Sequence, residues 1–193
     1  MTTLILGLLL FLGVHSVRIF ADPWRSAQIA RIGEMRWKGV YSLLSAAGLG
    51  LIIWGYGLAR AGDVVLWVPP LPMRHLAAGL TLPAFILLVA AYLPGSHIKA
   101  RVGHPMVAGV KLWALAHLLA NGNLADALLF GAFLAWAIAD FIAARRRDRI
   151  AGRTYPVCCS TRDASVVAIG TLAWAVFAFW GHALLIGVAP FRI

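Results

Sequence analysis

Charged residues are scarce in this sequence. They make up 12% of its 193 residues, and only 7 of them are Asp or Glu, whereas a soluble domain carries about 25%. With 62% hydrophobic residues and a mean hydropathy of +0.85, this composition excludes an ordinary soluble domain. It predicts a polytopic membrane protein whose core is the contact between helices, with lipid as the outer solvent.

Cysteine is almost absent as well. Cys158 and Cys159 are adjacent, and neighbouring cysteines rarely meet disulfide geometry. A disulfide framework is therefore excluded, and a reduced, cytoplasmic loop fits the pair. The N-terminus also lacks the basic region and the A-x-A-like site of a signal peptide, so residues 3–20 are interpreted as a retained first helix.

Six apolar segments have spanning or near-spanning length, for which about 20 residues are needed. They cover residues 3–20, 39–58, 74–93, 106–121, 124–143 and 165–188. Turn residues such as Gly62-Asp63 and Pro94-Gly95 separate them, and no repeat divides the chain. We expect an all-α membrane helix bundle of about six transmembrane helices that forms a single domain over residues 1–193.

Basic residues outnumber acidic ones by 17 to 7. Their place in the loops indicates a role in topology rather than nucleic-acid binding, because cytoplasmic loops of membrane proteins are rich in Lys and Arg. Loops one, three and five hold 13 of them, and the other loops and the tail, which includes Arg192, hold 3. The pattern predicts that loops one, three and five are cytoplasmic and that both termini face outward.

Two histidines lie inside apolar segments with almost nothing polar around them, His15 and His117. A titratable ring at membrane depth costs free energy unless it has a partner, so each is a candidate site residue. A purely structural hydrogen bond to a neighbouring helix is the alternative. His104 starts the fourth segment as a candidate interfacial cap, and His182 on the sixth is by depth a neighbour of His117.

Histidines from different helices of a bundle suit a haem iron held from both sides. The sequence contains no C-x-x-C-H, which excludes covalent haem attachment, and a zinc or copper site would need more converging ligands. Lys111 lies within the fourth segment, where we expect it to pair with Asp140 or with a haem propionate.

Several motifs resemble those of the NnrU family. The resemblance covers roughly residues 1–150, and its motifs are His15-Ser16, Arg31-x-Gly33-Glu34, Arg36-Trp37-Lys38-Gly39-x-Tyr41-Ser42, Gly103-His104-Pro105, Lys111-Leu112-Trp113-Ala114-Leu115-Ala116-His117 and Asn121-Gly122. The family includes bacterial inner-membrane proteins associated with denitrification and linked to production of nitrite and nitric oxide reductases. The resemblance implies a multi-pass protein of the bacterial inner membrane.

The NnrU family is also similar to the plant 15-cis-zeta-carotene isomerase, a membrane enzyme that uses haem b. This similarity implies haem b here, with His15 and His117 as iron ligands. From their positions and charge alone, His104, His182 and Lys111 are further candidate cofactor-binding residues. The isomerase has a cysteine three residues before its second histidine, where this chain has Ala114.

Three functions follow from these observations. The first is a haem-binding membrane protein with an accessory or regulatory role in denitrification, whose ligand is a nitrogen oxide. The second is a haem-dependent cis-trans isomerase of a hydrophobic polyene such as zeta-carotene. The third is a membrane scaffold without a cofactor. All three have membrane lipids as partners.

Overall fold

The protein is a bundle of helices in a computed structural model that describes residues 1–62 and 64–191. Asp63 and Arg192, which the sequence places in a loop and in the tail, lie outside the described residues. The helices are α1 (Thr2–Phe20), α2 (Asp22–Ile32), α3 (Glu34–Arg60), α4 (Leu71–Tyr92), α5 (His97–Val102), α6 (Pro105–Ala120), α7 (Leu124–Ile150), α8 (Ser160–Val176), the π-helical turn η1 (Phe177–Gly181) and α9 (His182–Ile186).

The predicted polytopic bundle is confirmed. Within the described residues, α1, α3, α4, α7 and the continuous stretch Ser160–Ile186 are long and apolar enough to cross a membrane. The predicted fourth segment is α6, whose 16 residues reach about 24 Å at 1.5 Å per residue. It falls short of a full hydrocarbon core of about 30 Å, so the expected count of six rests on this helix.

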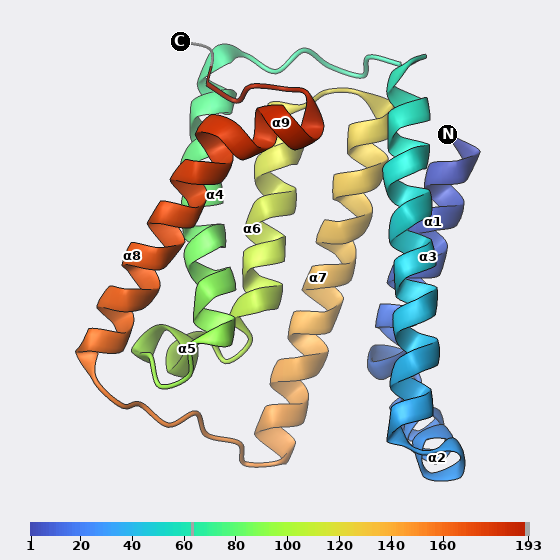
Figure 1. Cartoon of the computed structure of the whole chain (residues 1–193), viewed down its shortest axis with the longest axis vertical. Helices are drawn as coiled ribbons and strands as arrows, with labels where there is room; N and C mark the ends of the chain where they lie inside the picture. The colour runs from blue at the N-terminus through green and yellow to red at the C-terminus, as the bar shows by residue number, and fades with distance from the viewer. Residues whose placement is uncertain (63, 192–193) are drawn as a thin grey trace.

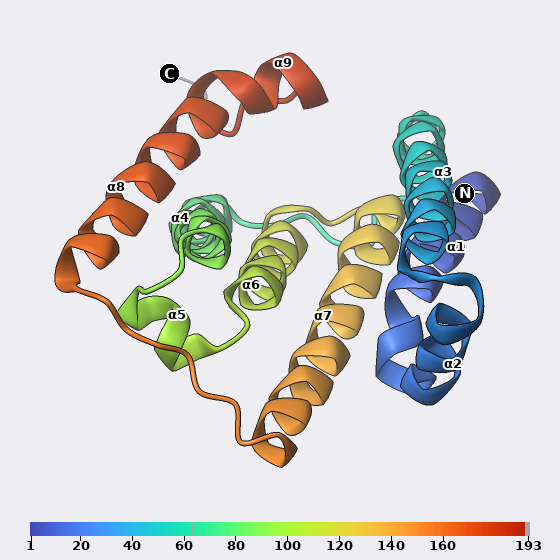
Figure 2. The ribbon, with the colours of Figure 1, turned by 60° about the horizontal axis from the view of Figure 1, so that its bottom comes forward.

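Helix α7 lies between two groups of helices (Figure 2). On one side α1 packs against α3, and on the other α4 packs against both α6 and α8, while α7 contacts α1, α3 and α6. Glycine allows the close approach of α1 and α3, because a Cβ at Gly48 would lie 2.8 Å from the backbone nitrogen of Phe11. Helices α1 and α6, both fully described, do not pack against each other, and α7 separates them.

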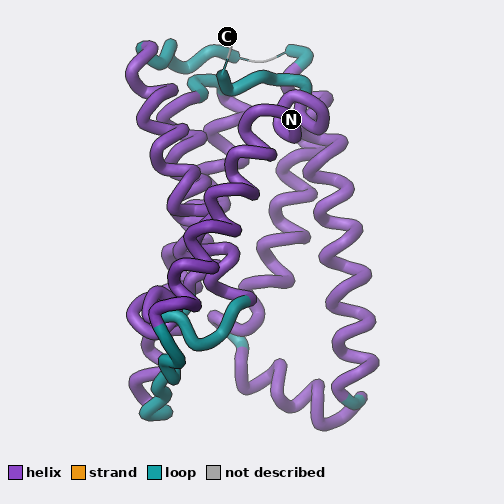
Figure 3. Tube along the Cα trace, turned by 60° about the vertical axis from the view of Figure 1, so that its left-hand side comes forward, coloured by secondary structure: helices purple, strands orange, loops and turns teal. Residues whose placement is uncertain are grey.

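The loops gather at two ends of the bundle (Figures 1 and 3). Helices α2 and α5 and the 151–159 loop share one end, and both termini lie at the other end with the 64–70 and 121–123 loops. The three basic loops therefore share one end, as the charge pattern requires. That this end is the cytoplasmic one stays a prediction.

Two short helices, α2 and α5, occupy segments that the sequence predicts as loops. The Asp22-Pro23 pair is an expected break, but Pro23 lies in the first turn of α2, where its fixed φ favours a helix start. In α5 the Ser96 hydroxyl accepts a hydrogen bond of 3.1 Å from the backbone N–H of Lys99, an N-cap that satisfies one unpaired donor.

A strap of chain, residues 64–70, crosses the end of the bundle that carries the termini. The backbone N–H groups of Leu66 and Trp67 donate to the Gly122 carbonyl over 2.8 and 3.1 Å, and the N–H of Leu124 donates to the Val64 carbonyl over 2.9 Å. Any Cβ at position 122 would overlap the Trp67 carbonyl oxygen. Only glycine therefore allows this contact between the strap and the turn before α7.

Candidate functional site

One face of α7 forms the floor of a long cavity, here called the trough. It has a volume of about 800 Å³, and its residues come from α1, α2 and α3 on one side, from the start of α6 on the other, and from α7 and the residues after it below. The α7 residues of the floor are Trp136, Asp140, Ala144, Arg147 and Asp148. The trough thus follows the half of α7 that lies nearer the basic loops.

His15 lines the trough from α1. Its Nδ1–H donates to the Phe11 carbonyl one turn earlier over 2.7 Å. Since a carbonyl can only accept, Nδ1 carries the proton and Nε2 keeps its lone pair, which is the arrangement of a histidine that ligates a metal. The ring is held by Phe11, Tyr41 and Trp136, with centroid distances of 4.2, 5.3 and 5.9 Å.

Trp136 also lines the trough, and its indole Nε1 is buried without a hydrogen-bond partner among the described residues. Buried donors in native proteins are nearly always satisfied, and an exception calls for an explanation such as a missing ligand or water. The acceptor for the Trp136 N–H would therefore have to come from outside the described residues.

Basic side chains outnumber acidic ones along the trough. Its lining includes the cations Arg18, Arg25, Lys38, Arg147 and Arg153 and the carboxylates Glu34, Asp140 and Asp148. Lys38 pairs with Glu34 over 2.7 Å and Arg147 with Asp140 over 3.9 Å. The Arg18 guanidinium has no carboxylate partner within the described part of the chain, so it is available to an anionic group of a ligand.

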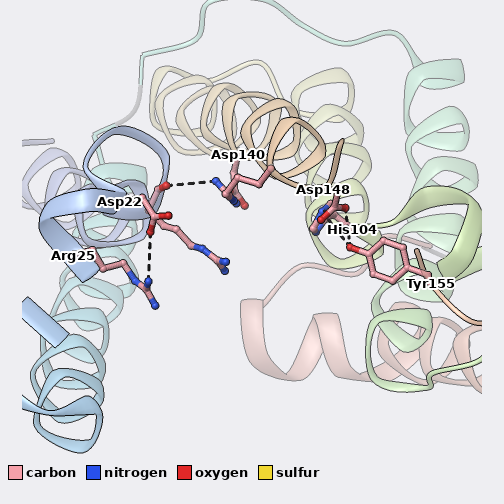
Figure 4. A network of polar contacts seen from close by, with 8 residues as sticks. Asp22, Arg25, His104, Asp140, Asp148 and Tyr155 are labelled. Carbon is pink, nitrogen blue, oxygen red and sulfur yellow. Dashed lines mark hydrogen bonds and ion pairs between the residues drawn. The ribbon is translucent and has the colours of Figure 1, made fainter. Parts of the chain in front are cut away.

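A hydrogen-bonded network closes the α6 side of the trough, on the opposite side of α7 from Asp22 and Arg25 (Figure 4). His104 Nε2 and the Tyr155 hydroxyl each donate to Asp148 over 2.8 Å. The carboxylate is 7% exposed, and burial together with the bond to Asp148 raises the pKa of Tyr155. His104 thus lines the trough but has its Nε2 committed to Asp148, unlike His15.

The structure places His117 apart from the trough. Its ring stacks on Phe130 of α7, with centroids 4.5 Å apart, and packs against Trp113 at 5.2 Å. Like His15, it donates Nδ1–H to the carbonyl one turn earlier, that of Trp113, over 2.8 Å. The two candidate ligands therefore share one orientation within their helices but have different surroundings.

A row of aromatic rings lies between the two histidines. The ring centroids of Phe11 and Phe133 are 5.8 Å apart, and those of Phe133 and Trp113 are 5.6 Å apart. His15 contacts Trp136 and His117 contacts Phe130, and these two partners are about 9 Å apart along the axis of α7. The structure thus brings both histidines to α7 but not to each other.

His182 lies beside His117, as their predicted depths suggest. Their ring centroids are 6.4 Å apart and their planes differ by 21°. His182 is presented by the turn that follows η1.

Lys111 does not pair with Asp140, which was one of its two expected partners. Its Nζ lies 3.6 Å from the centroid of the Phe141 ring, and Asp140 pairs with Arg147 instead. Lys111 is also not among the residues that line the trough. A cation over an aromatic face is stabilised without a carboxylate, which explains how the charge is accommodated within α6.

The sequence alone does not identify several residues of the site, above all Trp136, Asp148 and Tyr155. A signal is available for Trp136 alone, which lies four residues, about one helical turn, before the charged Asp140 in an otherwise apolar segment. Cys158 and Cys159 are exposed and free, and a hydrogen bond from Cys158 lowers the pKa of Cys159. They are not among the trough residues.

Within residues 1–62 and 64–191 no group of three or more His, Cys, Asp or Glu side chains could hold a metal ion. Neither a curated protein nor a solved structure matches the chain. The sequence model of one family, described as NnrU protein, matches residues 3–190. This match covers nearly the whole chain, its membrane helices and its trough included, and the protein is therefore a multi-pass membrane member of the NnrU family.

Proposed function

We propose that this protein binds haem b in the trough, with His15 as an iron ligand, and acts as an accessory or regulatory protein of denitrification in the bacterial inner membrane. The observation that carries the proposal is His15 itself. Its Nδ1–H is held by the Phe11 carbonyl, its Nε2 is left as a ligand atom, and it lines a cavity large enough for a cofactor.

The residues of the trough fit a haem in three respects. Its volume of about 800 Å³ lies in the usual range of cofactor sites, about 300–1,000 Å³. Aromatic side chains, among them Tyr41 and Trp136, suit the macrocycle, and Arg18 suits a propionate through charge-assisted hydrogen bonds. The unpaired N–H of Trp136 would find an acceptor on the cofactor or on a molecule bound to its iron.

Bound haem would supply an iron centre that takes up small nitrogen oxides, which is the chemistry that an accessory protein of denitrification requires. The chain's own residues would hold the cofactor by its ligand atom and its propionates and would shield it within the bundle. Pairing of His15 with His117 on one iron stays a prediction, since Phe133 and Trp113 would have to leave the space between the two rings.

Isomerase chemistry is less well supported. The position that carries a cysteine in the carotene isomerase is Ala114 here, and it is completely buried. No thiol is therefore present at this place to exchange with a histidine on the iron.

Absorption spectra of the purified protein in detergent test the proposal. The wild-type protein should contain haem that is extractable by acid and acetone, because no thioether attachment is present. His15→Ala should lose this haem, whereas His75→Ala, at the start of α4, should keep it with an unchanged spectrum. Wild-type protein that contains no haem and takes up none when haemin is added would contradict the proposal and favour a cofactor-free scaffold.

The same spectra decide the role of His117. A low-spin spectrum that becomes high-spin in His117→Ala would assign His117 as the second axial ligand. Unchanged haem content and spin state in that variant would leave His15 as the ligand from this pair. Binding of carbon monoxide or nitric oxide by the reduced protein would show that the iron has an exchangeable position, as the proposed role requires.

A further inference from the structure

We propose that an anionic phospholipid binds in a narrow slot between α1, α2 and α3, with an acyl chain in the slot and its headgroup on the cations at the mouth. The slot is a second cavity, of about 140 Å³, and its lining consists of aliphatic and aromatic side chains. It lies beside the trough and shares residues of α1 and α3 with it. The proposal does not depend on haem, because its central cation, Arg36, is not among the residues that line the trough.

Helix α3 forms one wall of the slot. The α3 residues that line it are Trp37, Val40, Tyr41 and Leu44. Their spacing of three and four residues places them on one face of the helix. Arg36 lies one turn before Val40 and continues the row of Val40 and Leu44 toward the basic loops, and it is exposed. A cation therefore follows the apolar residues of this wall at the end that carries the basic loops.

Helices α1 and α2 complete the slot. Val14 and Val17 line it from α1, and Arg18 lies one turn after Val14, toward the same end of the bundle as Arg36. Trp24 lines it from α2, which lies across this end (Figure 1). The Trp24 ring packs edge-on against that of Trp37, with centroids 5.9 Å apart. Tryptophan is enriched where the membrane meets water, so the pair places the mouth of the slot at headgroup depth.

The mouth carries an excess of positive charge. Residues 18–38 contain two carboxylates and five basic side chains, Arg18, Arg25, Arg31, Arg36 and Lys38. Arg25 and Lys38 each pair with a neighbouring carboxylate on the same helix. Arg36 has no carboxylate partner within the part of the chain that the structure describes. An anionic headgroup supplies the counter-charge that this region lacks, whereas a zwitterionic headgroup does not.

The size and the opening of the slot suit an acyl chain. An apolar cavity of about 150 Å³ holds one benzene molecule, so the slot takes up a stretch of about six carbon atoms. Cofactors need cavities of about 300–1,000 Å³. Val40 and Leu44 are 54% and 39% exposed, so the slot is open to the outside of the bundle. Since α1 and α3 are apolar enough to cross a membrane, the outside is lipid, and the chain enters sideways from the leaflet.

Lipid binding to the delipidated full-length protein, measured by native mass spectrometry in detergent, tests the proposal. The wild-type protein should bind phosphatidylglycerol at least about fivefold more tightly than phosphatidylcholine with the same chains, because one cation near an anionic headgroup contributes about 1 kcal/mol. Arg36→Gln should bind phosphatidylglycerol about fivefold more weakly for the same reason, with phosphatidylcholine binding unchanged. Arg60→Gln, in the last turn of the same helix, is the matched control and should bind both lipids like wild type.

A second variant tests the acyl chain separately from the charge. Val40→Trp fills the slot without changing any charge, and the exposure of Val40 leaves room for the larger ring outside the bundle core. It should weaken binding of both lipids. Glycerol phosphate, which resembles the headgroup without its chains, should not displace the bound lipid. His15→Ala should lose haem and bind phosphatidylglycerol like wild type, so the two proposals can fail independently.

Three results would overturn the proposal. Equal affinity of the wild-type protein for the two lipids would show that the headgroup charge is not recognised. Wild-type affinity for phosphatidylglycerol in Arg36→Gln would remove the cation from the site. Wild-type affinity in Val40→Trp, or displacement of the lipid by glycerol phosphate, would show that the lipid binds to the basic surface and not in the slot.

Discussion

The Trp136 ring stands at 90° to the His15 ring, with centroids 5.9 Å apart, and its buried N–H has no acceptor in the described structure. The two rings that contact each other here both belong to residues that line the trough. This relationship predicts that Trp136 contributes to binding more than to folding.

Trp136→Phe should weaken haem retention about tenfold, which corresponds to one hydrogen bond of about 1.4 kcal/mol. Trp174→Phe is a matched control, because the Trp174 N–H is satisfied within the protein by the Thr81 hydroxyl at 3.0 Å. That variant should lower the melting temperature and keep the haem. Haem transfer to apomyoglobin, timed for both variants, gives the comparison. Equal retention in Trp136→Phe and wild type would show that the indole N–H does not contact the ligand.

Lys111→Met should leave haem retention unchanged, since Lys111 lies over Phe141 and not in the trough. Loss of the cation–π contact costs about 0.5–2 kcal/mol of stability. This cost is offset because methionine is transferred from water into an apolar environment more favourably than lysine. Arg18→Gln provides the contrast, because it removes an unpaired cation of the trough and should speed haem loss. If Lys111→Met releases haem as fast as Arg18→Gln, the propionate role predicted for Lys111 holds instead.

The raised pKa of Tyr155 predicts a loss of stability at high pH. A raised pKa means that the folded state holds the phenol proton more tightly than the unfolded state does. The stabilisation is therefore complete below about pH 10, the ordinary tyrosine value, and declines as the pH rises above it.

The melting temperature of Tyr155→Phe should be about 2–4 °C below that of wild type at neutral pH, because one hydrogen bond of about 1 kcal/mol is lost. This difference should shrink above about pH 10. Tyr92→Phe serves as the control, since Tyr92 is 75% exposed, and it should match wild type throughout. Melting curves from neutral to strongly alkaline pH in detergent measure the effect. A constant difference across that range would contradict the role given to the Tyr155 proton.

A reporter fused after Gly152 should behave as cytoplasmic, because the loop after α7 shares its end of the bundle with the other basic loops. A fusion after Gly62, in the loop at the opposite end, should behave as periplasmic. Alkaline phosphatase and green fluorescent protein report the two sides. The reverse pattern would invert the topology but leave the grouping of the loops intact.

The spanning segments are predictable from the sequence because a helix in lipid must be apolar over nearly its whole length. The similar depth of His117 and His182 also follows from hydropathy, but that their rings lie near each other does not. Lateral order does not follow from hydropathy, so the interposition of α7 between His15 and His117 is not predictable. The trough is missed for a similar reason, since Asp148 and Tyr155 look like loop-end residues until the fold brings His104 against them.

The placement of α7 has a consequence for biosynthesis. The walls of the trough come largely from residues 14–41 and its floor from residues 136–153, so the cavity does not exist until α7 has left the ribosome and entered the membrane. Capture of the proposed cofactor by the nascent chain would therefore be confined to a late stage, after most of the protein has been made.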